Sequence, residues 1–392
     1  MTTTMVVGAS TLTDVQGAVR EAVGGALSRA STPAPTLALV MAAEPYPPEP
    51  LAAAVSAALG SIPWVGCCST GVFAGSRLLR EGLVVGLVSS PGARVGIGVE
   101  ASLAGEGRRA GAAATVRALA GFPAAPAAGW TRALLVFSDA SLGNAADVVR
   151  GALEIAGTGV VWAGAGVGGN RSSPRAQLAS GRAHTDSVVI TAIDAPARLA
   201  AGICHGFRPY GPPTLVTRAQ GPVAAELEYE PAFTVYQRAA QDHGDQVTPE
   251  SFADFATTHP LGIPRADGEH VIRDPLRVET DGGLRCFGEV PDGSLIRVME
   301  GDRDALLAAA RTASADARAA VSGPLAGAVV FDCVSRSFML GASFEDELRM
   351  VSDQLDPSVP LLGCLSYGEI GALGRGGPQF HNKTAVVLAL GR

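Results

Sequence analysis

The chain has almost no lysine: Lys383 is the only one among its 392 residues, and every other basic residue is an arginine. A nucleotide-binding P-loop needs a lysine at the end of a glycine-rich turn, so the sequence excludes that motif. The formal net charge is −7 at pH 7. Nucleic-acid-binding surfaces carry an excess of positive charge, so we expect no nucleic-acid partner.

Long apolar runs and paired cysteine motifs are missing as well. No uninterrupted apolar stretch reaches the roughly 18 residues of a membrane helix. The first residues, Met-Thr-Thr-Thr-Met, lack the basic and apolar regions of a signal peptide, so we expect a cytoplasmic protein without a membrane partner. None of the six cysteines forms Cys-x-x-Cys, which disfavours a structural metal site and favours buried, reduced thiols.

What the sequence does contain is a repeat of short apolar runs and longer apolar-periodic runs. These predict strands and helices in the order β-α-β-α-β-β over residues 4–88, again over 94–193, and a third time over 295–390. The predicted fold class is therefore α/β, with layered mixed sheets flanked by helices. We expect the last two strands of each unit to form an antiparallel pair.

The length favours at least two domains. Residues 1–200 hold the first two units, and a proline-rich stretch, Arg208–Pro213, follows close to their end. Residues 201–392 form the second predicted domain, in which an irregular α+β segment (201–292) precedes the third unit (293–392). Within that segment Asp281-Gly-Gly283 predicts a hairpin.

A glycine-rich turn follows the third strand of each unit. The turns are Cys67–Gly71, Gly164–Asn170 and Gly363–Ala372. The second one matches the letters G-x-G-x-x-G, but no helix is predicted directly after it, so it does not predict a dinucleotide site.

The C-terminal motifs resemble those of a known family, the FIST proteins, whose name joins F-box and intracellular signal transduction. The residues that carry the resemblance are Phe331–Arg336, Gly363–Gly371 and Phe380–Thr384, and weaker matches extend it over nearly the whole chain. The resemblance implies FIST N-terminal and C-terminal domains, a sensory role and a small ligand, with amino acids as candidates. No output domain is recognisable, so a separate signalling protein is the expected partner.

The third turn carries most of the polar side chains, and the candidate ligand-binding residues centre on it. They are Arg336, Ser366, Tyr367, Gly368, Glu369, His381, Asn382, Cys67, Ser69, Thr70 and Asn170. We expect Arg336 and Glu369 to meet at neighbouring strand ends. Such a pair either holds the two charged groups of an amino acid or braces the turn as a structural ion pair.

Three alternative functions remain open at this point, and the simplest of them is a partner-binding scaffold without a ligand. The family resemblance also implies a haem-binding nitric oxide sensor, for which His381 and His205 are candidate iron ligands. A hydrolase would use Cys364 or Ser366 as nucleophile and His381 as base. We expect no catalytic residues, because no Asp is evidently placed to orient His381. The cysteine spacing gives no reason to expect a metal site, and we expect no cofactor apart from the haem of the sensor alternative.

Overall fold

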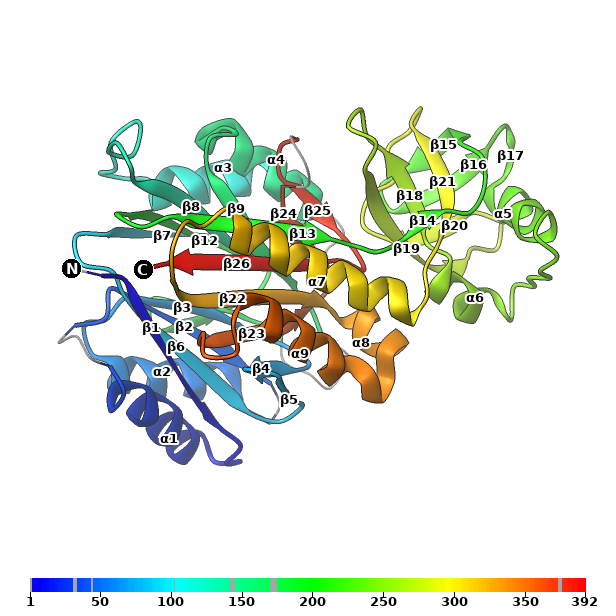
Figure 1. Ribbon diagram of the computed structural model, residues 1–392. Helices are drawn as coiled ribbons and strands as arrows, with labels where there is room; N and C mark the ends of the chain where they lie inside the picture. The colour runs from blue at the N-terminus through cyan, green and yellow to red at the C-terminus, as the bar shows by residue number, and fades with distance from the viewer. Residues whose placement is uncertain are drawn as a thin grey trace.

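The computed structural model describes residues 2–30, 34–43, 45–101, 103–141, 145–169, 175–372 and 376–392. The chain forms a large body of three six-stranded sheets and a smaller part that contains an eight-stranded sheet. The smaller part lies to one side of the body (Figure 1). The predicted class of layered mixed sheets with helices and two parts is confirmed.

Each of the three predicted units contributes one sheet of the body. The first contains β1 (Thr4–Ser10), α1 (Val15–Leu27), β2 (Leu37–Ala42), α2 (Pro48–Leu59), β3 (Trp64–Cys68) and β6 (Leu83–Ser89). The second contains β7 (Arg94–Ala101), α3 (Gly107–Ala118), β8 (Thr131–Asp139), α4 (Ala145–Ala156), β9 (Val161–Val167) and β12 (Ser187–Ala195). The third contains β13 (Leu199–Cys204), α7 (Arg303–Ala319), β22 (Leu325–Cys333), α8 (Val334–Leu340), α9 (Phe344–Leu355), β23 (Leu361–Ser366) and β26 (Ala385–Gly391).

The strand order differs from the predicted one. In every unit the second and third strands are parallel, and the last strand lies antiparallel between the first and the second. The expected pairing of the last two strands is therefore wrong. In the observed position the last strand has a hydrogen-bonded neighbour on each side, and β6 and β26 are buried along their whole length.

A short hairpin follows the third strand of each unit and joins the sheet of another unit. The hairpins are β4–β5 (Val72–Ala74, Arg77–Leu79), β10–β11 (Gln177–Ala179, Arg182–His184) and β24–β25 (Glu369–Gly371, Gln379–His381). β4 pairs with β23, β10 with β3 and β24 with β9. The exchange is cyclic, so each sheet is completed by a hairpin from a different unit.

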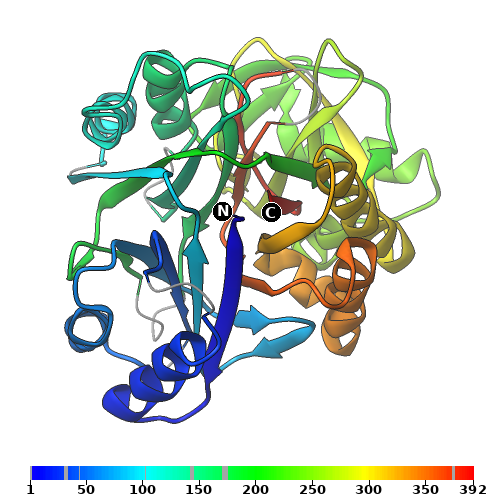
Figure 2. The same cartoon turned by 60° about the vertical axis from the view of Figure 1, so that its left-hand side comes forward.

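The main core lies where the inner faces of the three sheets meet. It is apolar and draws residues from all three units, among them Met41, Phe137 and Phe331. The rings of Phe137 and Phe331 meet edge to face with centroids 5.8 Å apart. The N- and C-termini lie near each other at one end of this core, with helices on the outside (Figure 2).

The smaller part is an insertion between β13 and α7. It contains β14 (Arg208–Pro209), β15 (Thr214–Gln220), β16 (Val223–Leu227), β17 (Glu230–Pro231), α5 (Ala232–Gln241), α6 (Phe252–Thr258), β18 (Leu261–Pro264), β19 (His270–Val278), β20 (Leu284–Phe287) and β21 (Leu295–Glu300). The hairpin predicted at Asp281 is confirmed, because it joins β19 to β20.

The assignment of Leu295–Met299 as the first strand of the third unit is wrong. That segment is β21 of the insertion, and β13 pairs with β26 in its place. The insertion separates β13 from the rest of its unit, so the repeat could not be read from neighbouring segments of the sequence. Among the described residues, no helix is long and apolar enough to span a membrane.

Candidate functional site

Glu369 lies at the start of β24 and is completely buried. Its carboxylate accepts hydrogen bonds from the Ser366 hydroxyl (2.6 Å) and from the backbone N–H of Thr384 (3.1 Å). Burial raises the pKa of Glu369 to about 8, although these hydrogen bonds act in the opposite direction. Ser366 and Glu369 therefore join the end of β23 to the beginning of β26.

Arg336, on α8, is also completely buried, but Glu369 is not its ion-pair partner. Its guanidinium forms ion pairs with Asp332 (3.1 Å) and Glu347. It also donates to the carbonyl oxygens of His205 (3.0 Å) and Leu306 (2.8 Å). The expected Arg336–Glu369 pair is thus wrong, because two other carboxylates of the third unit hold the guanidinium inside the core.

His381 is a third buried residue of the predicted site. Its Nε2 bonds to the carbonyl oxygen of Gly371 at 3.2 Å. Burial lowers the pKa of His381 to about 3, so the ring is neutral at physiological pH. Among the described residues, His381 has no hydrogen bond to Ser366 or Cys364, so neither nucleophile–base pair considered from the sequence is assembled.

His381 and His205 are the candidate haem ligands, and both are buried. His381 is 0% exposed and His205 is 7% exposed. Nε2 of His381 is already hydrogen-bonded, and Nδ1 of His205 accepts from the N–H of Phe207 at 2.9 Å. Neither ring lines the cavity described below. In this arrangement the two histidines do not fit axial coordination of a haem iron.

The candidates from the first turn lie mainly inside the body. The sulfur of Cys67 is 3.8 Å from that of Cys364, and both are buried. Ser69 donates to the carbonyl oxygen of Leu365 at 2.6 Å, which ties the first turn to β23. Thr70 is half-buried beside it. Asn170 lies outside the described residues.

A cavity of about 260 Å³ lies between the insertion and the carboxyl ends of β22 and β23. Tyr367, Gly368 and Asn382 of the predicted site line it. Gly368 has φ +105°, and a Cβ there would be 2.1 Å from Cζ of Phe380, so the turn requires glycine. The other residues that line the cavity are Asp274, Leu276, Phe287, Cys333, Val334, Ser335 and Phe338.

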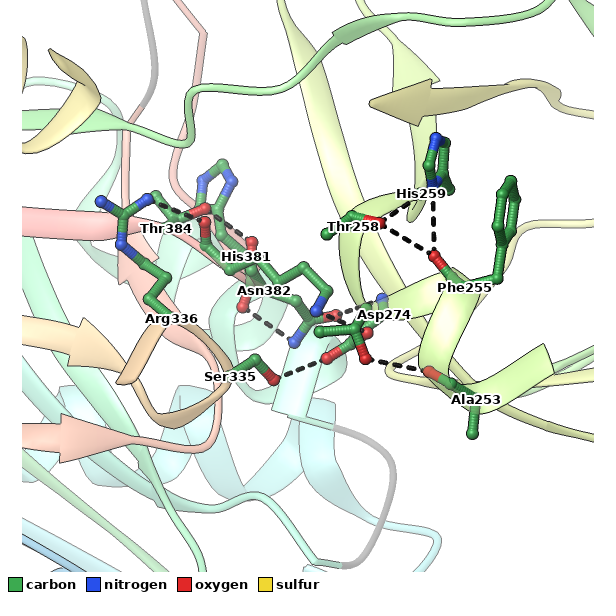
Figure 3. A network of polar contacts seen from close by, with 12 residues as sticks. Ala253, Phe255, Thr258, His259, Asp274, Ser335, Arg336, His381, Asn382 and Thr384 are labelled. Carbon is green, nitrogen blue, oxygen red and sulfur yellow. Dashed lines mark hydrogen bonds and ion pairs between the residues drawn. The ribbon is translucent and has the colours of Figure 1, made fainter. Parts of the chain in front are cut away.

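Asp274, on β19, connects the insertion to the body at the base of this cavity (Figure 3). Its carboxylate accepts a hydrogen bond from the Ser335 hydroxyl at 2.6 Å. Nζ of Lys383 lies 3.1 Å from its other oxygen. Its backbone N–H donates to Oδ1 of Asn382 at 3.4 Å. The polar base of the cavity is therefore built from both parts of the chain.

Asp274, Ser335 and Lys383 belong to the base of the cavity but are not among the residues predicted from the sequence. The single lysine was visible, and it directly follows two of the predicted residues. Its partner could not be found from the sequence, because Asp274 lies more than a hundred positions earlier in a strand that was read as part of an irregular segment.

Comparisons with known proteins agree with the motifs. A family model described as the FIST N domain matches residues 36–230, and one described as the FIST C domain matches residues 232–372. Two relatives from Mycobacterium tuberculosis strains CDC 1551 and H37Rv, both named uncharacterized proteins, are 26% identical over 388 residues. The match covers 97% of this chain and 97% of each relative.

Among solved structures, the chain is similar to a cyanuric acid hydrolase at 9% identity and a TM-score of 0.35, over 100% of both chains. A cyanuric acid hydrolase from A. caulinodans gives the same identity and TM-score over 98% of both chains. At this level the similarity says nothing about the activity of the present chain.

Proposed function

The chain belongs to the FIST family, since the FIST N and FIST C matches together extend over residues 36–372, and from this premise we propose that it is a small-ligand-binding sensory protein of signal transduction. FIST domains are known as sensory domains. The observation that carries the proposal is the cavity of about 260 Å³ between the insertion and the body. A ligand there would contact both parts of the chain and would stabilise their contact.

The ligand we propose is an amino acid or a similar small polar metabolite. The cavity volume suits a molecule of this size, and its wall combines apolar side chains with a few polar groups, as in most small-molecule sites. The carboxylate of Asp274 would accept hydrogen bonds from an ammonium group. Leu276 and Phe338, at 46% and 69% exposure, would cover the apolar portion.

Binding rather than catalysis is the proposed role. It is supported by the position of Ser366, whose hydroxyl donates to Glu369, and by the neutral, carbonyl-bonded ring of His381. The signal would then pass to a separate protein. The free cysteines support a cytoplasmic location, since thiols persist in reducing compartments.

Calorimetry and thermal-shift measurements with a panel of amino acids and related metabolites test the proposal. We expect at least one to bind, and we expect Asp274→Asn and Leu276→Ala each to weaken its binding about tenfold. The matched control is Leu12→Ala, because Leu12 is 47% exposed but does not line the cavity. Binding that survives both cavity variants unchanged would place the site elsewhere, and the absence of any binder would overturn the sensory role.

A further inference from the structure

Aromatic rings are concentrated around this cavity. Aromatic residues make up 5% of the chain, whereas Phe287, Phe338 and Tyr367 are three of the ten residues that line the cavity. The rings of Phe287 and Tyr367 lie with centroids 6.2 Å apart and are tilted by 48°. Both residues line the cavity, and their rings are tilted rather than stacked on each other.

The rings and the polar groups occupy different depths. Phe338 is exposed at the mouth, while Phe287 and Tyr367 are half-buried. Asp274 is 7% exposed and Asn382 is 1% exposed, so these two polar residues lie deeper than the rings. A ligand that enters past Phe338 would therefore meet the aromatic side chains before the carboxylate of Asp274.

Charged side chains are scarce in the lining of the cavity. Among the described residues, no arginine, lysine or histidine lines the cavity, and Asp274 is the one acidic residue that does. Lys383 lies behind Asp274, is 1% exposed and is not part of the lining. Burial raises the pKa of the Cys333 thiol, so this lining residue adds no negative charge.

We propose that the cavity binds organic ammonium cations, with the cationic head among the three rings and against Asp274. Aromatic faces attract cations, and the attraction is larger when the cation is desolvated, which the depth of the cavity favours. A carboxylate on the ligand would find no cationic side chain in the lining. The inference rests on the proposed sensory function and narrows its ligand class: amines and quaternary ammonium compounds bind more tightly than the corresponding amino acids.

Two pairs of probes test this on the unmodified protein by calorimetry. Choline is compared with 3,3-dimethylbutan-1-ol, a neutral molecule of nearly the same shape, and 2-phenylethylamine is compared with phenylalanine. We expect the cation of each pair to bind about tenfold more tightly or better. These comparisons need no variant, so they do not depend on how a substitution affects folding.

Three variants locate the effect. Phe338→Leu keeps an apolar side chain at the mouth but removes the ring, and we expect about a three- to tenfold loss of choline affinity with no loss for the neutral alcohol. Asp274→Asn removes the negative charge and should weaken choline binding about tenfold or more. Leu12→Ala is the remote control and should leave both affinities unchanged.

The outcomes separate this inference from the proposed function. Equal affinity for choline and its neutral analogue, or tighter binding of phenylalanine than of 2-phenylethylamine, overturns the ammonium class while the cavity remains a small-ligand site. If the protein binds cations selectively but Phe338→Leu does not weaken that binding, the placement of the cationic head among the three rings is overturned. If neither these probes nor the metabolite panel binds, both the inference and the sensory function are overturned.

Discussion

Glu369 links the stability of the fold to pH. Its carboxyl group is completely buried, and burial raises its pKa from the ordinary value of 4.5 to about 8. Between these values the folded protein keeps a proton that the unfolded chain has released. The contribution of Glu369 to stability is therefore present below pH 4.5 and is lost as the pH rises through about 8.

The variant Glu369→Gln tests this link, because glutamine cannot release a proton. Between about pH 5 and about pH 9, we expect the stability of the variant to rise relative to wild type by on the order of 3 kcal/mol. The measurement is the free energy of unfolding from urea titrations. Loss of the hydrogen bond from Thr384 would change the free energy of unfolding of the variant by the same amount at every pH, so it would not affect the pH dependence of the difference from wild type. If the free energies of unfolding of wild type and variant change with pH in parallel, the raised pKa of Glu369 is contradicted.

Arg336 shows why a charged residue in a specific motif can be structural. Its side chain is 0% exposed and lies between Asp332 and Glu347, both of them also at 0%. An isolated buried charge is very costly, so the two carboxylates and the carbonyl groups around the guanidinium are required for its burial. The motif Phe331–Arg336 therefore connects β22 to α8 and α9 rather than presenting a charge to a ligand.

At the scale of the elements, the parallel pairing within each unit depends on a glycine in the third strand. In the first unit this is Gly66, opposite Val40 of β2. A Cβ on Gly66 would lie 1.6 Å from the carbonyl oxygen of Val40, far inside van der Waals contact. Gly363 of β23 has the same relation to Val330, with a distance of 2.1 Å.

We expect Gly66→Ala to destabilise the protein by about 3 kcal/mol or more, because β2 and β3 must separate to admit the methyl group. Gly24→Ala is the matched control. Gly24 lies in α1, and a Cβ there would meet no atom within 4 Å. Alanine also suits a helix better than glycine, so this variant should gain about 0.5–1 kcal/mol. Urea unfolding of both variants checks the difference, and a similar effect in the two would refute the close-approach argument.

The sequence was sufficient for elements whose signal is local. Strands such as β8 and helices such as α1 follow from apolar runs and from periodicity, and Asp14, a residue type that favours the N-cap position, accepts the N–H of Gly17 at the start of α1. The order of strands in a sheet is not local, so β6 was placed beside β3 although it lies between β1 and β2. The same limit hid β13, which is separated from α7 by the whole insertion.

In the candidate site too, features with a local sequence signal could be predicted and features that depend on distant segments could not. The turn that holds Tyr367 and Gly368 was found, because its glycines and polar side chains stand out in an alanine-rich chain. Its opposite wall, with Asp274 and Phe287, comes from the insertion and has no motif that ties it to the turn. Burial also could not be read from the sequence: Arg336 and Glu369, both predicted ligand-binding residues, are completely buried.

At the scale of the whole molecule, the exchanged hairpins make the three units depend on one another. The second sheet is completed by β24–β25 of the third unit, and the third sheet is completed by β4–β5 of the first. The boundary between the two family-model matches lies at residues 230–232, at β17 inside the insertion. The matched segments therefore do not coincide with separate bodies in the structure.

Cutting the chain between Arg198 and Leu199 tests this dependence, because this position separates the second unit from the third. In residues 1–198 the second sheet lacks β24–β25, and in residues 199–392 the third sheet lacks β4–β5. Each half also exposes apolar side chains that meet in the shared core. We expect each half alone to aggregate or to show little protection from amide hydrogen exchange, and the two expressed together to form a complex with the protection pattern of the intact chain. A half that purifies as a monomer with native-like protection would show that its sheets do not need the exchanged hairpin.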